Sequence, residues 1–245
     1  MRAIKALFSD LLSGLTLLSR LPMPAHRHSG AASGWSWPLV GLVIAAPAAL
    51  MIWLGTEAGI AAGPLAAAVL VVMAMLTGAL HEDGLADTAD GLFGGQSRER
   101  RLEIMKDSRI GSYGTLALLL ITLASWSALS ALIAKGTAIP ALLAMAALSR
   151  VPMVLLMAAL PAARPNGISA SSGRPSALQA VLALILGGAI AAALLGGAFP
   201  VPLAGLVIVS LALGQSARAR LGGQTGDILG ASQQLSFALG LSLLA

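Results

Sequence analysis

The acidic residues of this 245-residue chain are concentrated in one short stretch. Seven of the ten Asp and Glu residues lie between positions 81 and 114, although long apolar runs flank that stretch. If a helix begins near Glu82, then Asp83, Asp87 and Asp90 are spaced i, i+4 and i+7 and project from one face. Like charges at that spacing repel one another, so helix stability alone does not explain them.

A divalent cation would offset this repulsion. Hard carboxylate oxygens without soft ligands nearby suit Mg²⁺, which takes few carboxylates and fills its remaining positions with water and substrate phosphate. The predicted metal ligands are Glu82, Asp83, Asp87 and Asp90. Gly84 and Gly91 in the same stretch are expected to let the backbone approach a bulky ligand closely. A solvated acidic loop is the alternative interpretation.

A basic segment follows Asp83, Asp87 and Asp90, which are called the acidic row below. Its candidate phosphate-binding residues are Arg98, Arg101, Lys106 and Arg109. A metal held by acids beside guanidinium groups is typical of phosphoryl transfer, because cation and Arg or Lys both take up negative charge. The alternative is an interfacial helix with internal ion pairs lying on anionic lipid headgroups. The Gly-rich turn at residues 108–114 could bind phosphate through its backbone N–H groups.

Three further polar features lie in the second half of the chain. Arg150 is a charge inside an apolar run, so it should face the bundle interior and a substrate phosphate or an acidic residue, with snorkelling as the alternative. Arg164 belongs to a polar loop at residues 161–174 that could close over a substrate or serve as an ordinary connector. Asp227 stands in a Gly-rich stretch before the last helix, as a second metal ligand, a hydroxyl-binding group or an N-cap.

The composition indicates an integral membrane protein. The chain is 57% hydrophobic and 10% charged, with a mean hydropathy of +0.88, whereas soluble domains carry about 25% charged residues. With no cysteine, disulfides and thiolate sites are excluded. The net charge of +5 reports topology and headgroup contact in such a protein, and no nucleic-acid partner is expected.

The apolar runs predict an all-α, polytopic helical bundle, since unsatisfied backbone groups are too costly in hydrocarbon for other structures. An amphipathic helix at residues 2–19 should lie on the membrane, and residues 1–245 should form one domain. Six to seven spans are expected, at residues 35–54, 60–80, 115–134 and 139–160, two within 175–217 broken at 196–202, and a short one at 228–245.

The distribution of basic residues predicts the orientation. With the N-terminus in the cytoplasm, all of the 15 Lys and Arg residues except Lys135 and Arg150 fall on the inner side, as the positive-inside rule requires. The same placement gathers the polar loops, including an active-site loop at residues 81–114, on the cytoplasmic face of a bacterial cytoplasmic (inner) membrane.

The acidic run HEDGLADTADG at residues 81–91, followed by IMKDSRIGSYG at residues 104–114, resembles the signature of the cobalamin synthase family, the adenosylcobinamide-GDP ribazoletransferases. LPMP at residues 21–24, Ser149-Arg150, and GQTGDILGA at residues 223–231 support this resemblance. It extends over nearly the whole chain in order and spacing. Departures from the family pattern are slight: the connecting helices are rich in Ala and Leu, and the final helix is short.

The resemblance implies a Mg²⁺-dependent membrane enzyme that joins adenosylcobinamide-GDP to α-ribazole, or its 5′-phosphate, and releases GMP. The acidic row would hold one or two Mg²⁺ ions on the diphosphate while a ribazole hydroxyl attacks the phosphorus attached to cobinamide. The candidate proton acceptors are Asp107, Glu82 and His81. Expected partners are these substrates, the lipid bilayer, and a second copy or other cobalamin-assembly enzymes.

Other functions predict different patterns. A CDP-alcohol phosphotransferase would have arginine where Asp87 follows Asp83-Gly84-Leu85-Ala86. A UbiA-like prenyltransferase would have two separated Asp-rich motifs. A cation transporter with a cytoplasmic acidic site would carry charges deep within several spans, whereas Arg150 is the one charge within these runs.

Overall fold

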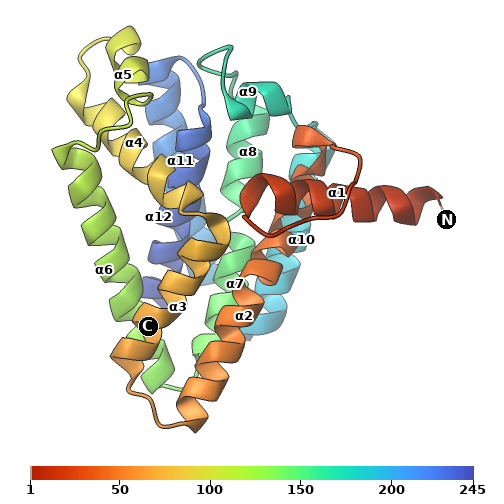
Figure 1. Ribbon diagram of the computed structural model, residues 1–245, viewed down its shortest axis with the longest axis vertical. Helices are drawn as coiled ribbons and strands as arrows, with labels where there is room; N and C mark the ends of the chain where they lie inside the picture. The colour runs from red at the N-terminus through yellow and green to blue at the C-terminus, as the bar shows by residue number, and fades with distance from the viewer. Residues whose placement is uncertain (1) are drawn as a thin grey trace.

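The computed structural model describes residues 2–245, with side chains from Ile4 onward. Apart from an isolated bridge between Ala162 and Gln224, the regular structure of this part is helical (Figure 1). The elements are α1 (Arg2–Leu18), η1 (Gly30–Ser36), α2 (Trp37–Glu57), α3 (Ala62–Thr77), α4 (Leu80–Gly94), α5 (Arg98–Ile104), α6 (Ser112–Ala134), α7 (Ala138–Leu148), α8 (Val151–Ala159), α9 (Ile168–Ser172), α10 (Ala177–Leu195), η2 (Gly196–Ala198), α11 (Pro200–Leu221) and α12 (Gly226–Leu244). The all-α prediction is confirmed.

Several of these helices form membrane spans. Within residues 2–245, five are long and apolar enough to cross a bilayer: Gly30–Glu57, Ser112–Ala134, Ala138–Ala159, Ala177–Ala198 and Pro200–Leu221. The bent pair of α3 and α4 makes a sixth if it is counted as one span. The chain is therefore a multi-pass membrane protein. The count is below the expected upper figure of seven because α12 does not pass as a span of its own.

The predicted boundaries agree with most of the spans. The expected helices at 35–54 and 115–134 appear as α2 and α6, and the expected break at 196–202 appears as η2 between α10 and α11. The helix expected at 139–160 is interrupted between α7 and α8, at Ser149 and Arg150. Pro152 accounts for the interruption, because it offers no N–H to the carbonyl of Leu148 and its ring crowds that residue.

A sharp bend separates α3 from α4. The two helix axes differ by 89°, and both linking residues are left-handed, with φ of 64° at Gly78 and 54° at Ala79. Gly78 is suited to this conformation, whereas Ala79 has a Cβ that opposes it. The bend turns α4, which carries the acidic row, across the end of the bundle. Much of the loop expected at residues 81–114 is helical, because it forms α4 and α5.

The centre of the bundle contains the α7–α8 span and α12. In the α7–α8 span, 83% of the apolar 18-residue window is buried inside the structure, whereas in the α10 span the share is 22%. Helix α10 therefore faces outward. On α12, Phe237 and Leu241 are buried in the same apolar core as Leu142 and Met145 of α7. The helix expected as a short final span is thus the internal support of α4, against which it packs.

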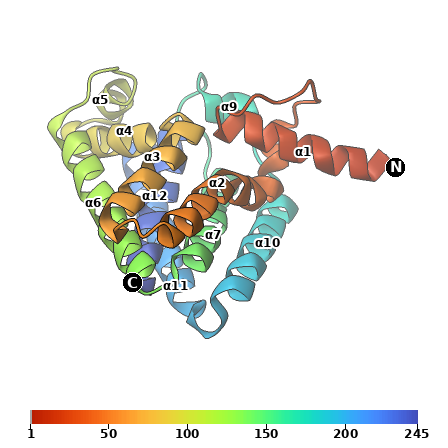
Figure 2. The same ribbon diagram turned by 60° about the horizontal axis from the view of Figure 1, so that its bottom comes forward.

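Helix α1 projects sideways from the bundle (Figure 2). Leu12, Leu15 and Leu18 are buried, whereas Ile4 and Phe8 are exposed. The helix expected at residues 2–19 is present, and its position on a membrane surface stays a prediction.

Candidate functional site

Helices α4 and α12 cross at very close range. An ideal Cβ on Gly84 would lie 2.9 Å from the carbonyl oxygen of Asp227 and 3.3 Å from the Cα of Gly230. These glycines therefore let two backbones meet, because any side chain there would separate the helices. Gly84 was expected to let the backbone approach a bulky ligand, but in the structure it lies against the backbone of α12. As a consequence, Asp227 lies beside the acidic row.

Asp83 lines two cavities. The first, of about 360 Å³, is lined by Asp83, Arg164 and Asp227. The second, of about 480 Å³, is lined by Asp83, Asp87 and side chains from residues 105–110. The ion pairs among described side chains do not include Asp83 or Asp87. Two carboxylates without a cationic partner thus face the space in which a substrate would lie.

Asp90 is engaged differently from the other two aspartates. It is 8% exposed, and its carboxylate accepts the backbone N–H groups of Gly111 at 2.7 Å and Gly114 at 2.9 Å. These donors belong to the first turn of α6 and the residue before it, where helical N–H groups have no internal partner. Asp90 therefore holds α6 against α4, and the Gly-rich turn expected to bind phosphate binds this carboxylate instead.

The expected phosphate-binding residues of the basic segment fall into two groups. Arg98 joins α5 to the end of α11 and to the loop after α8, because its Nε and Nη2 donate to the carbonyls of Leu221 and Ala163, both at 2.8 Å. Arg101 has a buried Nε without a hydrogen-bond partner. Lys106 and Arg109 instead line the second cavity with Asp107.

Asp107 and Arg109 form a pair at the mouth of that cavity. The Arg109 guanidinium lies 2.7 Å from the carboxylate, and Arg109 is 87% exposed. Hydrogen bonds from the guanidinium and backbone of Arg109 lower the pKa of the Asp107 carboxyl to about 2. Asp107 is thus ionised at neutral pH and weakly basic. The alternative of ion pairs within the segment is also observed, between Arg100 and Glu103 at 2.7 Å.

Arg164 and Asp227 are brought together by a short bridge between loops. The N–H of Ala163 donates to the carbonyl of Gln224, and the N–H of Gln224 donates to that of Pro161, both at 2.8 Å. Arg164 then reaches Asp227 at 2.8 Å, with their side chains 16% and 17% exposed. The N-cap of α12 is Thr225, which accepts the N–H of Ile228, so the N-cap role considered for Asp227 is wrong.

Beneath α4 lies a buried polar layer. Arg150 is 1% exposed and its Nη1 donates to the carbonyl of Ala146 at 2.6 Å. Interior placement is confirmed and snorkelling is wrong, while the ion pairs of described side chains do not include Arg150. His81 is fully buried and neither ring nitrogen has a partner. Glu82 accepts the Gln234 amide at 2.9 Å, and its other oxygen is unpartnered.

Two glutamines of α12 were missed by the sequence analysis. Gln233 donates to the Ser149 hydroxyl at 3.1 Å, beside Arg150, and Gln234 holds Glu82. The available signal was an adjacent pair of amides within an otherwise apolar final helix. Such groups are costly in a membrane interior unless they are hydrogen-bonded.

The carboxylates of α4 have the number and type of oxygen ligands that Mg²⁺ takes from a protein. Among the described side chains, no group of three or more His, Asp or Glu residues is arranged as a ready-made cation site. Mg²⁺ usually needs one or two carboxylates and obtains its other ligands from water and substrate phosphate. The free carboxylates of Asp83 and Asp87 beside one cavity match that requirement in number and type.

Known proteins resemble the chain along nearly its whole length. The family description "cobalamin-5-phosphate synthase" matches residues 10–245. Proteins named adenosylcobinamide-GDP ribazoletransferase are 40% identical in Bradyrhizobium diazoefficiens, over 94% of this chain and 91% of that protein, and 42% identical in Sinorhizobium medicae, over 100% and 99%. No solved structure matches the chain. The chain therefore belongs to the cobalamin-5-phosphate synthase family of enzymes.

Proposed function

We propose that the chain joins adenosylcobinamide-GDP to α-ribazole, or to α-ribazole 5′-phosphate, and releases GMP. The relatives carry a name for this transfer. The observation that carries the proposal is the position of Asp83, which lines one cavity with Arg164 and Asp227 and another with Lys106 and Arg109. Carboxylates and bases around two cavities that share Asp83 suit a diphosphate that must be neutralised while an acceptor approaches.

Asp83 and Asp87 would be the principal ligands of Mg²⁺. Glu82, with one free oxygen, and Asp90, whose oxygens each accept one N–H, stay predicted as further ligands. When bound, the ion would neutralise the diphosphate oxygens and the charge that develops on the departing GMP.

The chain's own side chains would position and neutralise the substrates. Lys106 and Arg109 line the cavity of Asp87 and would take up charge on the phosphates, as Arg164 would on the other side of Asp83. Glu82 and His81 are the candidates for accepting the hydroxyl proton, since both have unpartnered atoms. Asp107 is the poorer candidate, because its low pKa makes it a weak base.

The location in the cell is part of the same proposal. The charge distribution supports an orientation with the N-terminus and the α4 end in the cytoplasm, where the nucleotide substrate would be available. The sources of the relatives, Bradyrhizobium diazoefficiens and Sinorhizobium medicae, support a bacterial cytoplasmic (inner) membrane. A second copy or other cobalamin-assembly enzymes are proposed as partners, with no nucleic acid.

The proposal is tested by GMP release from purified protein in lipid vesicles supplied with adenosylcobinamide-GDP, α-ribazole and Mg²⁺. We expect EDTA to abolish release and added Mg²⁺ to restore it. Asp83→Asn and Asp87→Asn should each lower kcat by about 10²–10³-fold, the usual cost of removing one electrostatic stabiliser. Glu99→Gln is the matched control, because this exposed acid of α5 lies outside both cavities.

Near-normal turnover in both aspartate variants would refute the metal assignment. Absence of GMP from the wild-type protein under all these conditions would refute the transfer itself. Labelling from outside that modifies a cysteine introduced at residue 99 in intact cells would refute the orientation.

A further inference from the structure

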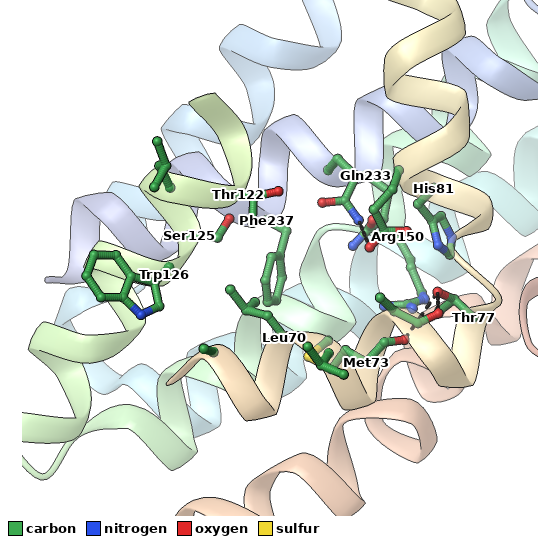
Figure 3. Close-up of a pocket in the computed structure, with 16 residues that line it drawn as sticks. Leu70, Met73, Thr77, His81, Thr122, Ser125, Trp126, Arg150, Gln233 and Phe237 are labelled. Carbon is green, nitrogen blue, oxygen red and sulfur yellow. Dashed lines mark hydrogen bonds between the residues drawn. The ribbon is translucent and has the colours of Figure 1, made fainter. Parts of the chain in front are cut away.

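A second polar feature of the bundle is a cavity beneath α4 that the acidic row does not fill. It has a volume of about 370 Å³ and lies between α3, α6 and α12 (Figure 3). Pockets for small organic ligands occupy about 300–1,000 Å³. Its size therefore suits a molecule of a few fused rings or a nucleoside.

One end of this cavity is polar and unsatisfied. His81 has two free ring nitrogens, Arg150 a free Nε and Gln233 a free Oε1, all in buried positions, and their side chains are 0%, 1% and 3% exposed. Figure 3 shows the three side chains close together at this end. Buried polar atoms without partners are costly, so a ligand with several hydrogen-bonding groups would stabilise this arrangement.

The other end of the cavity is apolar. Leu70 and Met73 of α3, Trp126 of α6 and Phe237 of α12 line it, and they lie on the side away from His81 (Figure 3). The aromatic rings offer flat surfaces on which a flat apolar ring system can stack. The complete cavity thus matches a ligand with one apolar aromatic part and one hydroxyl-rich part.

Glu82 connects this cavity with the acidic row. It lines the cavity beneath α4 and also the cavity that contains Asp83 and Asp87. A ligand hydroxyl near Glu82 and His81 would therefore lie beside the proposed position of the diphosphate. This is the placement that an attacking hydroxyl requires.

From these observations we propose that the cavity beneath α4 is the binding site of the acceptor nucleoside. The benzimidazole base of α-ribazole would stack against Phe237 and Trp126, and its ribose would face His81, Arg150 and Gln233. This assignment rests on the proposed function and adds the location of the acceptor.

A bilayer lipid fits the same cavity less well. Gln233 stands seven residues into α12 from Gly226, which places its polar group about 10 Å below that end of the helix at 1.5 Å per residue. A phospholipid headgroup stays at the membrane surface and would not reach the buried polar groups at this depth.

A bulkier side chain in the lining of the cavity tests this assignment, while His81, Arg150 and Gln233 at its polar end are left in place. Thr122 lines the cavity from the exposed side of α6, so Thr122→Phe should place a ring within the cavity and still insert normally. Leu120→Phe is the matched control, because Leu120 is 64% exposed and outside the cavity. We expect Thr122→Phe to raise the KM for α-ribazole at least about tenfold, a loss of about 1.4 kcal/mol. The KM for adenosylcobinamide-GDP should change less than about twofold.

Direct binding separates this assignment from the proposed function. Equilibrium dialysis of labelled α-ribazole with the full chain in detergent, without the second substrate, should show binding that Thr122→Phe weakens and Leu120→Phe does not. Such a result without GMP release would overturn the proposed function alone. GMP release with an unchanged KM and unchanged binding in Thr122→Phe would overturn the acceptor site alone. A co-purified phospholipid that Thr122→Phe removes, with that same unchanged KM, would also overturn it and assign the cavity to lipid.

Discussion

Substitution of Asp90 by asparagine tests the structural role of a carboxylate that, unlike Asp83, is already hydrogen-bonded to the backbone. The Asp90 carboxylate accepts two backbone N–H groups, of Gly111 and Gly114, at 2.7 and 2.9 Å. Hydrogen bonds to a charged partner contribute about 1.5–3 kcal/mol each. Asparagine keeps one acceptor oxygen but turns an NH₂ group toward the other N–H, so about 2–4 kcal/mol should be lost. Asp83→Asn instead removes a repelling charge that has no ion-pair partner.

Thermal unfolding in detergent, followed by tryptophan fluorescence in EDTA, distinguishes the two variants without a contribution from metal. At about 2–4 °C per kcal/mol for a chain of this size, Asp90→Asn should lower Tm by about 4–16 °C. Asp83→Asn should leave Tm unchanged or raise it slightly, because like charges on one helix face oppose folding. An unchanged Tm for Asp90→Asn, or an equal fall for both variants, would contradict this account of how α6 is held.

Two further predictions concern how α4 and the polar loops are positioned. Gly230→Leu should lower both Tm and GMP release, because even a Cβ at this position would lie 3.3 Å from the His81 backbone. Gly197→Leu is the control and should change neither quantity, because Gly197 has open space around it. Equal effects of the two substitutions would contradict the close crossing of α4 and α12. Arg164→Gln should cost up to about 3–5 kcal/mol, the cost of leaving one charge of a buried pair unpaired, and adding Asp227→Asn should restore part of it. A double-mutant cycle from denaturant unfolding measures this coupling, and strict additivity would show that the pair observed at 2.8 Å contributes no coupling energy.

The membrane spans could be predicted from the sequence, whereas the bend that orients the acidic helix could not. The apolar runs predicted α2, α6 and the break at 196–202 because the length and polarity of a span are local properties. They did not predict the 89° bend after α3, where a non-glycine residue, Ala79, adopts a left-handed conformation. Nothing in the local sequence requires alanine there. The conformation is accompanied by backbone hydrogen bonds from the Ala79 N–H to the carbonyl of Ala74 and from the Asp83 N–H to that of Ala79.

Composition, apolar runs and residue spacing were sufficient to identify the class of protein, the family and the concentration of acids on one helix face. The packing of the bundle established which of these groups share a space: Glu82 contacts Gln234, 152 positions away, Arg164 pairs with Asp227, 63 positions away, and Asp90 accepts an N–H from the first turn of α6. The physical reason is that helical periodicity specifies which face of a helix is polar but not which helix lies against it. That choice depends on close approach at positions such as Gly84 and Gly230, which becomes visible only when the whole bundle is packed.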